Sequence, residues 1–462
     1  MIRPLTILLL TIAIMLIPDF VVWGAETEKS TSQVIDWTNI KVLDLDTAKR
    51  IAFAANPSLE AAEMRVKQAQ ERVKQTRAAY YPRFDLTASA SRIRLSDNTY
   101  QAMLQSGRDN PENRYKTGMT ANWVLFDGFE RRFIHAGARI GAKESREAQK
   151  DAWRQLASAL AKAYYRGLLA RENMAILDAD EKFNQRQIDD AKARRNVGTG
   201  SLSDVLNFKV QINAARSERN QVELNYANAI YALATLMGTD PDVSPETGLP
   251  PDIKLGQLES ETEKALFLPD SKPLINYALK HRPDIIQGEY ALKRSQAEYG
   301  AARAQFYPDL NLTAALDGER DGSASLVYDD FGDAITLNLS YNLFAGGADK
   351  ARLAETRLQI KEAQKNLTNF KNVVVSEVRD ALAGLKAGQA ELRLQRANAS
   401  LVQQNRDLVE KEYAAGEGSL VRLNEAQRDM IKAQSRLALA RVGLRQAWHN
   451  LKVSTAEILE DF

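Results

Sequence analysis

The chain contains no cysteine, and this absence excludes several kinds of bond and site. Without thiols it forms no disulfide, so packing or oligomerisation must stabilise the fold. It also lacks a cysteine that could carry a lipid anchor. Histidine is scarce, and His135, His281 and His449 are scattered without an HExxH pattern. We therefore predict no metal site and no cofactor.

An excess of charge of one sign is missing as well. Lys and Arg total 62, Asp and Glu total 60, and the formal net charge is +2. This balance gives no support to a nucleic-acid partner, which needs a basic face. Neither a phosphate-binding GxxxxGK[ST] loop nor a GxSxG nucleophile motif occurs. We predict that the protein is not an enzyme, and that any transport takes its energy from a partner.

Only one long apolar run is present, at the N-terminus. Arg3 precedes LTILLLTIAIMLI, Pro18 ends the run, and Gly24 and Ala25 follow. This layout predicts a secretory signal peptide at residues 1–25, cut near residue 24 or 25. The alternative is an uncleaved anchor, but about 13 apolar residues span a bilayer poorly.

Proline is absent from two long stretches, residues 112–240 and the chain after Pro308. Six prolines instead crowd the segment from residue 241 to residue 273. Because proline breaks helices, the two stretches allow very long helices on either side of a linker at residues 241–271.

The chain is an internal duplication. The segment NPSLEAAEMRVKQAQERVKQTRAAYYPRFDLTAS at 56–89 pairs with RPDIIQGEYALKRSQAEYGAARAQFYPDLNLTAA at 282–315. The offset of 226 residues falls to 218 at LFDG (125–128) and LFAG (343–346), which predicts variable loops at 96–114 and 317–333. We assign a first repeat to residues 26–240 and a second to residues 272–462.

Each repeat is predicted to contain one helix before two strands and two helices after them. Apolar residues spaced by three and four indicate coiled-coil packing of these helices, and Leu394, Leu401 and Leu408 predict a packed seam. The predicted helix lengths place the linker and both chain termini together, about halfway along the long helices. The expected helices are 44–78, 130–196 and 201–237 in the first repeat, and 272–303, 348–414 and 419–455 in the second.

The predicted strands have two different faces. Leu337 and Leu339 alternate with Asn338 and Ser340, so one face is apolar and the other is polar. The strand lengths match those of membrane barrels, and aromatic residues gather where strands meet helices. We expect the leucines to face lipid. A half-buried sheet on a soluble core is the alternative.

Two repeats supply four strands, which are too few to close a barrel. An open sheet in lipid leaves its edge groups unpaired, at several kcal/mol each. If the strands lie in a membrane, the chain must oligomerise. Two copies give an eight-stranded, plugged barrel, and three copies give twelve strands and a pore.

These features together resemble the TolC-type outer-membrane efflux proteins. The resemblance rests on the YYPRFDLTAS and FYPDLNLTAA junctions, on LFDG and LFAGG, and on VGTGSLSDVL, and it covers nearly the whole mature chain. It implies a mainly α-helical homotrimer with a transmembrane β part, in which a twelve-stranded barrel continues as a long helical tunnel.

The resemblance also implies a place and partners. The channel would lie in the outer membrane of a Gram-negative-type envelope, contact its lipid, and extend into the periplasm. A periplasmic adaptor and an inner-membrane pump would complete an efflux or type I secretion system. The alternative is a periplasmic coiled-coil scaffold without a pore; a diffusion porin would need more strands and little helix.

Two sharp bends join the long helices to the shorter ones. In each, a glycine suits the left-handed position that ends a helix, and a serine suits the next N-cap. Asp204 completes a capping box in the first bend, whereas Arg422 stands there in the second. Such turns need no partner, but the resemblance implies that they face the adaptor. The residues so assigned are Val197, Gly198, Ser201, Leu202, Asp204, Val205, Leu206, Gly416, Gly418, Ser419 and Leu420.

Acidic residues precede the second bend. Asp407 and Glu410 lie on a helix face of small and polar residues, which suits either outer solvent or a water-filled lumen. The resemblance of DLVEKEYAAG (407–416) to the family's acidic constriction implies the lumen, with Asp189 on a neighbouring helix. Three chains would gather six carboxylates, so we predict a cation-selective pore that multivalent cations block.

Overall fold

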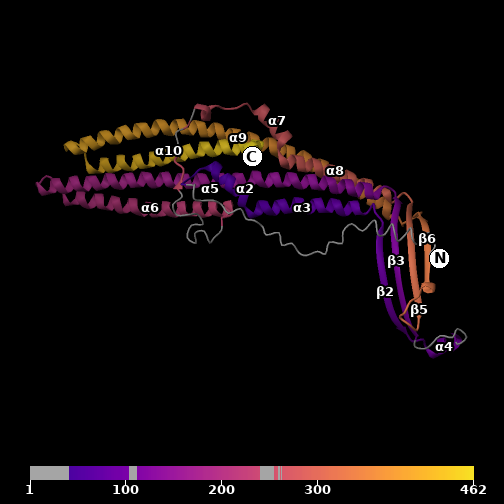
Figure 1. Ribbon diagram of the computed structural model, residues 1–462. Helices are drawn as coiled ribbons and strands as arrows, with labels where there is room; N and C mark the ends of the chain where they lie inside the picture. The colour runs from indigo at the N-terminus through magenta and orange to yellow at the C-terminus, as the bar shows by residue number, and fades with distance from the viewer. Residues whose placement is uncertain (1–40, 104–111, 240–253, 259–260, 262, 462) are drawn as a thin grey trace. The chain divides into compact units, whose positions relative to one another are not determined.

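The computed structural model describes residues 41–103, 112–239, 254–258, 261 and 263–461 (Figure 1). The predicted signal peptide lies outside the described residues. Helices form most of the described chain, and four of the strands form one sheet. Within the described ranges, no helix is both long enough and apolar enough to cross a membrane.

The helices confirm the internal duplication. Four helices of the first repeat each have a counterpart of nearly the same length in the second, at the offsets expected from the sequence. The pairs are α2 (Leu45–Ala55) and α7 (Ser271–His281), α3 (Pro57–Ala78) and α8 (Pro283–Ala304), α5 (Glu130–Asn196) and α9 (Ala348–Ala415), and α6 (Leu202–Met237) and α10 (Leu420–Thr455).

The expectation of one helix before the strands is wrong in both repeats, because each helix is broken in two. Asn56 separates α2 from α3, and Arg282 separates α7 from α8; both have extended backbone, with ψ of 118° and 127°. Each precedes a proline, which disfavours the helical conformation for the residue before it and opens the next helix at its first position.

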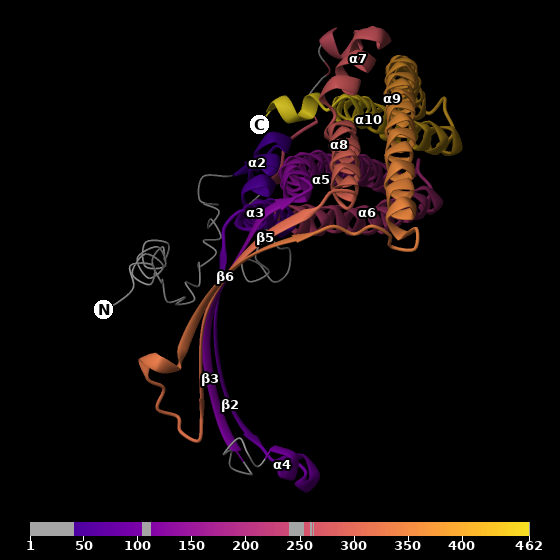
Figure 2. The same cartoon turned by 90° about the vertical axis from the view of Figure 1, so that its right-hand side faces the viewer.

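The long helices form one layer with two free ends. α5 contacts α6 and α10, and α10 contacts α9, so the order is α6, α5, α10, α9 (Figure 1); Figure 2 shows the same helices nearly end-on. The expected seam of α9 is not packed within the chain, since Leu394, Leu401 and Leu408 are 66%, 66% and 57% exposed. These leucines face away from α10 because α10 packs on another face of α9, through residues such as Val409.

The described part of the predicted linker lies next to α5. Strand β4 (Lys254–Leu255) pairs in parallel with β1 (Val42–Leu43), next to α5. Arg171 of α5 donates to the carbonyls of Leu255 and Gly256. The 3-10 turn η3 (Glu263–Leu266) leads on to α7, and 3-10 turn η5 (Glu457–Asp461) follows α10.

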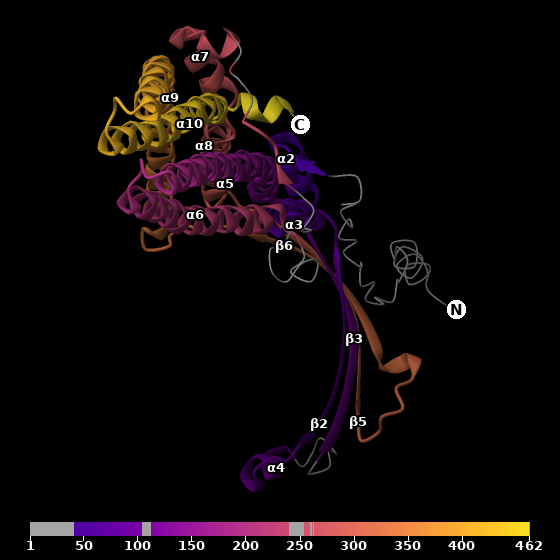
Figure 3. The ribbon, with the colours of Figure 1, turned by 90° about the vertical axis from the view of Figure 1, so that its left-hand side faces the viewer.

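The main sheet has four antiparallel strands in the order β2, β3, β5, β6 (Figure 3). Strands β2 and β6 have the expected length, with 11 and 10 residues, whereas β3 and β5 are longer, with 16 and 13. The ends of β3, β5 and β6 take up parts of the predicted variable loops. Helix α4 (Asp97–Met103) follows β2, and 3-10 turn η4 (Tyr328–Asp330) precedes β6. The strands are β2 (Arg83–Ile93), β3 (Glu112–Asp127), β5 (Asp309–Asp321) and β6 (Phe331–Ser340).

The strand register confirms the two faces of the sheet. Trp123, Leu312 and Leu337 are aligned across β3, β5 and β6, and the adjacent row is polar. In that polar row Thr313 donates to the side chain of Asn122 at 3.0 Å. Both faces of β6 are exposed within the single chain. An apolar face that remains open to the surroundings is consistent with contact to lipid.

Candidate docking tips and acidic site

The first tip joins α5 to α6. Gly198 has a φ of +84°, the left-handed conformation expected for it. Its amide donates to the carbonyl of Arg195 at 3.0 Å, and the amide of Thr199 donates to that of Arg194 at 2.9 Å. These bonds satisfy carbonyls that the end of α5 leaves free.

The predicted capping box is not formed at this tip. Ser201 is the N-cap of α6, and its hydroxyl accepts from the amide of Ser203 at 3.0 Å. Asp204 lies instead beside the phenol of Tyr413. Burial raises the pKa of Tyr413, and the charge of Asp204 raises it further. The acidic residue therefore contributes to the contact between the two tips.

The second tip repeats the turn with a different cap. Gly416 has a φ of +81°, and the amides of Glu417 and Gly418 both donate to the carbonyl of Glu412. Ser419 caps α10 by accepting from the amide of Arg422 at 3.3 Å. The side chain of Arg422 pairs with Glu412 at 3.2 Å, so the residue that replaces the acid bonds to the preceding helix.

Both tips close over one hydrophobic cluster, the tip core. Phe208 is fully buried in it, and its ring contacts that of Tyr413 edge-on. Val205 is 4% exposed and belongs to this core, so we expect it to shape the tip rather than to touch a partner. The tip core consists of Phe183, Ile188, Ala191, Val205, Phe208, Ile212, Val409, Tyr413, Leu423 and Ala426.

Several of the predicted docking residues do face outward. Val197, Leu202 and Leu206 of the first tip are 76%, 48% and 51% exposed. Leu420 of the second tip is only partly buried and packs against the tip core. The first tip thus exposes three large apolar side chains, whereas the second exposes Val421, at 63%, and part of Leu420.

The contacts that hold the two tips together were not predicted from the sequence. Arg194 donates to the carbonyls of Tyr413 and Ala414 at 3.3 and 3.2 Å, and its guanidinium lies over the Tyr413 ring. Asn424 donates to Asn207 at 2.8 Å. The sequence signal was present, because a cation in the last turn of a helix commonly bonds to free carbonyls.

The acidic site also contains a cation that was not predicted from the sequence. Arg406 pairs with Glu410 at 2.6 Å and with Asp407 at 3.3 Å. Its guanidinium lies over the ring of Phe183. Gln187 of α5 donates to Glu410 at 3.4 Å and connects the two helices. One positive charge therefore offsets part of the charge of the two carboxylates.

Asp189 occupies the position of the first repeat that is equivalent to Asp407. It accepts from Gln185 at 3.3 Å and lies 3.8 Å from the ammonium of Lys192, and its side chain is 61% exposed. No contact that the structure describes joins Asp189 to Asp407 or Glu410. Within one chain the three predicted carboxylates thus form two separate groups, each with its own cation.

The geometry offers no metal centre, since no cluster of three or more metal-ligating His, Cys, Asp or Glu side chains forms among the described residues. The described chain instead combines three features. They are two matched repeats, a sheet with one apolar and one polar face, and a pair of helical tips. The family model described as "Outer membrane efflux protein" matches residues 50–239 and 274–457. The chain belongs to the outer membrane efflux protein family. Each of the two matched segments lies within one of the two repeats.

Known relatives agree with this membership. The toluene efflux pump outer membrane protein TtgC of Pseudomonas putida is 27% identical over 369 residues, which cover 78% of this chain and 72% of the relative. Protein CyaE of Bordetella pertussis is 28% identical over 406 residues, which cover 86% and 80%.

Solved structures share the fold. The CmeC outer membrane channel of Campylobacter jejuni matches with a TM-score of 0.76 at 20% identity, covering 89% of this chain and 85% of that one. The outer membrane protein VceC of Vibrio cholerae matches with a TM-score of 0.74 at 19% identity, covering 89% and 95%. This outer membrane efflux protein is a transport conduit of the outer membrane and not an enzyme.

Proposed function

We propose that three copies of this efflux protein close a twelve-stranded barrel and a helical tunnel, and so form a passive exit duct. The sheet carries this proposal. Strands β2 and β6 are its two edges, and they run in opposite directions. β6 of one chain therefore suits antiparallel pairing with β2 of the next, which removes every unpaired edge from the lipid.

The helices support the same ring. Leu394, Leu401 and Leu408 form an exposed apolar stripe on α9, at one end of the helix layer. Val210, Leu224 and Tyr231 form another on α6, at the opposite end, and the residues of both stripes are separated by seven residues or by twice seven. Different surfaces that meet head to tail generate a closed ring, so α6 of one chain packs on α9 of the next.

Within this assembly the two faces of the sheet receive different environments. The row that holds Leu337 faces lipid, and the row that holds Asn122 and Thr313 faces the lumen. Residues 1–25 act as the signal that exports the chain. The tips then lie at the inner end of the tunnel, where the periplasmic adaptor and inner-membrane pump of a tripartite system dock.

The outward residues Val197, Leu202 and Leu206 provide the main contact for the adaptor, and the second tip provides a smaller one. Asp407, Glu410 and Asp189 line the narrow inner end. Arg406 lowers the net negative charge there, so cation selectivity is present but moderate. The exported cargo passes from this end toward the barrel, and the pump supplies the energy.

Light scattering of the detergent-purified protein tests the number of chains. We expect a protein mass three times that of one chain, together with ion conductance in a planar bilayer. A single-chain or two-chain mass would contradict the ring. A stable trimer that conducts no ions would favour the coiled-coil scaffold instead.

Cysteine cross-linking tests which surfaces meet. Because the chain has no native cysteine, only the introduced thiols can react. The double variant Leu224→Cys, Leu401→Cys should give dimers and trimers with a short bismaleimide. Each single variant should remain monomeric on a denaturing gel, because a head-to-tail contact does not place a residue next to its own copy. Efficient dimers from a single variant would instead indicate a two-fold interface.

A further inference from the structure

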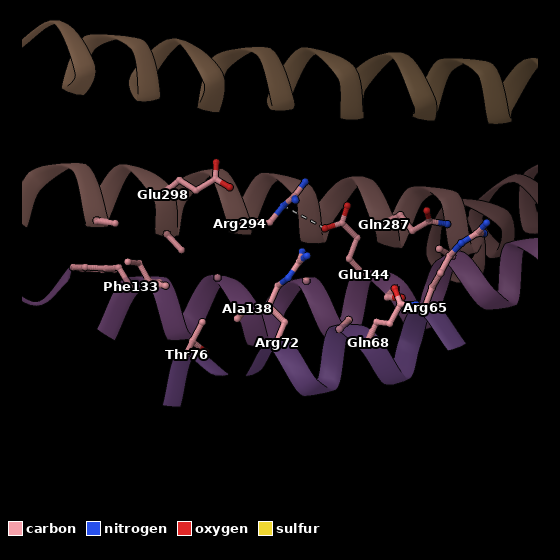
Figure 4. A pocket seen from close by; sticks show the side chains of 18 residues that line it. Arg65, Gln68, Arg72, Thr76, Phe133, Ala138, Glu144, Gln287, Arg294 and Glu298 are labelled. Atoms are coloured by element: carbon pink, nitrogen blue, oxygen red, sulfur yellow. Dashed lines mark ion pairs between the residues drawn. The ribbon is translucent and has the colours of Figure 1, made fainter. Parts of the chain in front are cut away.

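A groove between α3 and α8, with α5 as its floor, contains a cavity of about 570 Å³ (Figure 4). We call it the arginine groove. Arg65 and Arg72 rise from α3, and Arg294 extends from α8 toward Glu144 of α5. Small residues form the floor, and an added Cβ at Gly141 would meet no atom within 4 Å. The volume is typical of sites for small organic molecules.

The groove has spare positive charge. Three arginines and two glutamates line it, and Arg294 forms the ion pair with Glu144, at 3.4 Å. Arg65 and Arg72 lie two helical turns apart on the same side of α3. Apolar side chains complete the lining next to these charges. They are Phe133, Ile134, Ala138, Ala297 and Ala301.

The second repeat shows that the fold itself does not require this groove. The positions equivalent to Arg65 and Arg72 hold Ala291 and Glu298. The floor positions equivalent to Gly137 and Gly141 hold Glu355 and Gln359. Helices α8 and α9 keep nearly the same lengths as α3 and α5 without arginines above a glycine floor. The arginines of α3 and the glycine floor of α5 therefore have no counterpart in the second repeat.

The groove opens on the polar side of the sheet. Phe126 shares the apolar row of Leu310, and its ring contacts Phe129 at the start of α5. One turn further along α5 is Arg132, and Arg139 continues the same exposed stripe. Gly141 lies about 200° around the helix from Arg139, so the floor of the groove is on the opposite face. In the proposed trimer that face lines the lumen.

We propose that the arginine groove binds organic anions, carboxylates or sulfonates with an apolar body of one or two rings, as they pass through the duct. This inference rests on the proposed function for its place in the lumen. Guanidinium groups form paired hydrogen bonds with such anionic groups, and the apolar lining accepts the body. Together with the acidic inner end, the groove gives the duct a second site of opposite charge.

Calorimetric titration with naphthalene-1-sulfonate tests the proposal on the full-length protein in detergent. We expect saturable binding of one molecule per chain, weaker at high salt because screening reduces the attraction. Naphthalene-1-methanol, which has the same ring system without the charge, should bind at least tenfold more weakly. Equal binding of the two compounds, or no saturable binding of the sulfonate, would overturn the inference.

Three variants locate the site. Arg65→Gln with Arg72→Gln should weaken sulfonate binding at least tenfold. Gly141→Gln, which copies the second repeat, should fill the floor and abolish binding, and its new Cβ would meet no atom within 4 Å. Arg139→Gln, an exposed arginine on the opposite face of α5, is the matched control and should change nothing. Loss of binding in the control, or its persistence in Gly141→Gln, would contradict the assignment.

Recordings in planar bilayers separate this inference from the proposed function. The sulfonate should reduce the current of the wild-type channel and leave that of Gly141→Gln unchanged. A protein that binds the sulfonate but conducts no ions would support the groove as a binding site and contradict the proposed duct. A conducting channel that binds no sulfonate would keep the duct and refute the groove.

Discussion

Phe208 in the first repeat is fully buried in the tip core, while its equivalent in the second repeat is Ala426. Ile188, also in that core, corresponds to Arg406 at the acidic site. The backbones around these positions match closely, since α6 and α10 have the same length. The two repeats thus share the positions of their helix ends and differ in the size and charge of the side chains between those ends.

Some features of the molecule depend on the backbone fold and occur in both repeats, whereas others depend on individual side chains. Helix ends recur because the glycines and prolines that set them recur. The size and charge of the side chains at equivalent positions, and the space around them, differ between the repeats. The glycine floor at Gly141, the cation at Arg406 and the exposed Val197 and Leu206 of the first tip each belong to one repeat only. We expect changes at equivalent positions to have unequal effects.

The largest expected difference concerns the tip core. Phe208→Ala should cost about 3–5 kcal/mol of local stability, because it removes a buried ring and leaves a cavity. Hydrogen exchange of the tip amides measures this cost. Leu202→Ala, at an exposed position of the same helix, should change protection little. Similar losses in the two variants would show that Phe208 does not organise the tip.

A second difference appears with pH. His449 is buried in α10, whereas its equivalent Tyr231 is exposed. Burial, followed by the charge of Lys49, lowers the pKa of His449 to about 4. The unfolded chain binds the proton near pH 6.5, so stability is present above that pH and falls as the pH drops toward 4.

The loss at pH 4 should be on the order of 3 kcal/mol, since one pKa unit corresponds to about 1.4 kcal/mol. Thermal unfolding in detergent between pH 7.5 and 4.5 measures it. His449→Gln removes the titrating group and should flatten the part of the pH dependence that lies in this range. An unchanged slope in that variant would assign the acid sensitivity to another group.

The two turn glycines should behave alike, which checks the shared backbone. Gly198→Ala and Gly416→Ala should each cost about 1–2 kcal/mol, because an L side chain strains the left-handed position. Gly443→Ala, inside α10 with no atom within 4 Å of the new Cβ, should instead stabilise by roughly 0.5–1 kcal/mol. A gain at either turn would contradict the left-handed assignment.

Arg406→Gln should have the smallest effect on stability, about 1 kcal/mol or less, since partly exposed ion pairs contribute little. Its effect on conduction should be clear, because Asp407 and Glu410 lose their cation. We expect greater cation selectivity, measured as a larger reversal potential across a salt gradient. Asp407→Asn in the same background should reverse part of the gain. A reversal potential that stays constant would place these residues away from the ion path.

Much of the fold could be predicted from the sequence because the repeat locates each element twice. The long helices, the turns at Gly198 and Gly416 and the two-faced strands follow from proline, glycine and alternation. The breaks at Asn56 and Arg282 were missed, although the following prolines signalled them. The two-residue pairing of β1 with β4 gave no periodic signal, since strands this short have no alternation to detect.

The candidate site was less predictable, since it depends on contacts between distant segments. The exposure of Leu202 and Leu206 could be expected at a sharp turn, but the burial of Val205 depends on a cluster drawn from four helices. Arg406 stands beside Asp407 in the sequence, yet its reach to Glu410 follows from helix geometry. The arginine groove was visible in principle, as glycines in one repeat opposite large residues in the other.

The linker between the repeats is held by its backbone. Arg171 donates to the carbonyls of Leu255 and Gly256, and the equivalent Gln389 donates to those of Ala265 and Phe267 at 3.2 and 3.1 Å. Carbonyl groups are the same in every residue, so these two clamps do not distinguish the side chains they hold. Evolution is therefore free to exchange the clamped residues, while a change in the spacing between the clamps would pull one of them out of register.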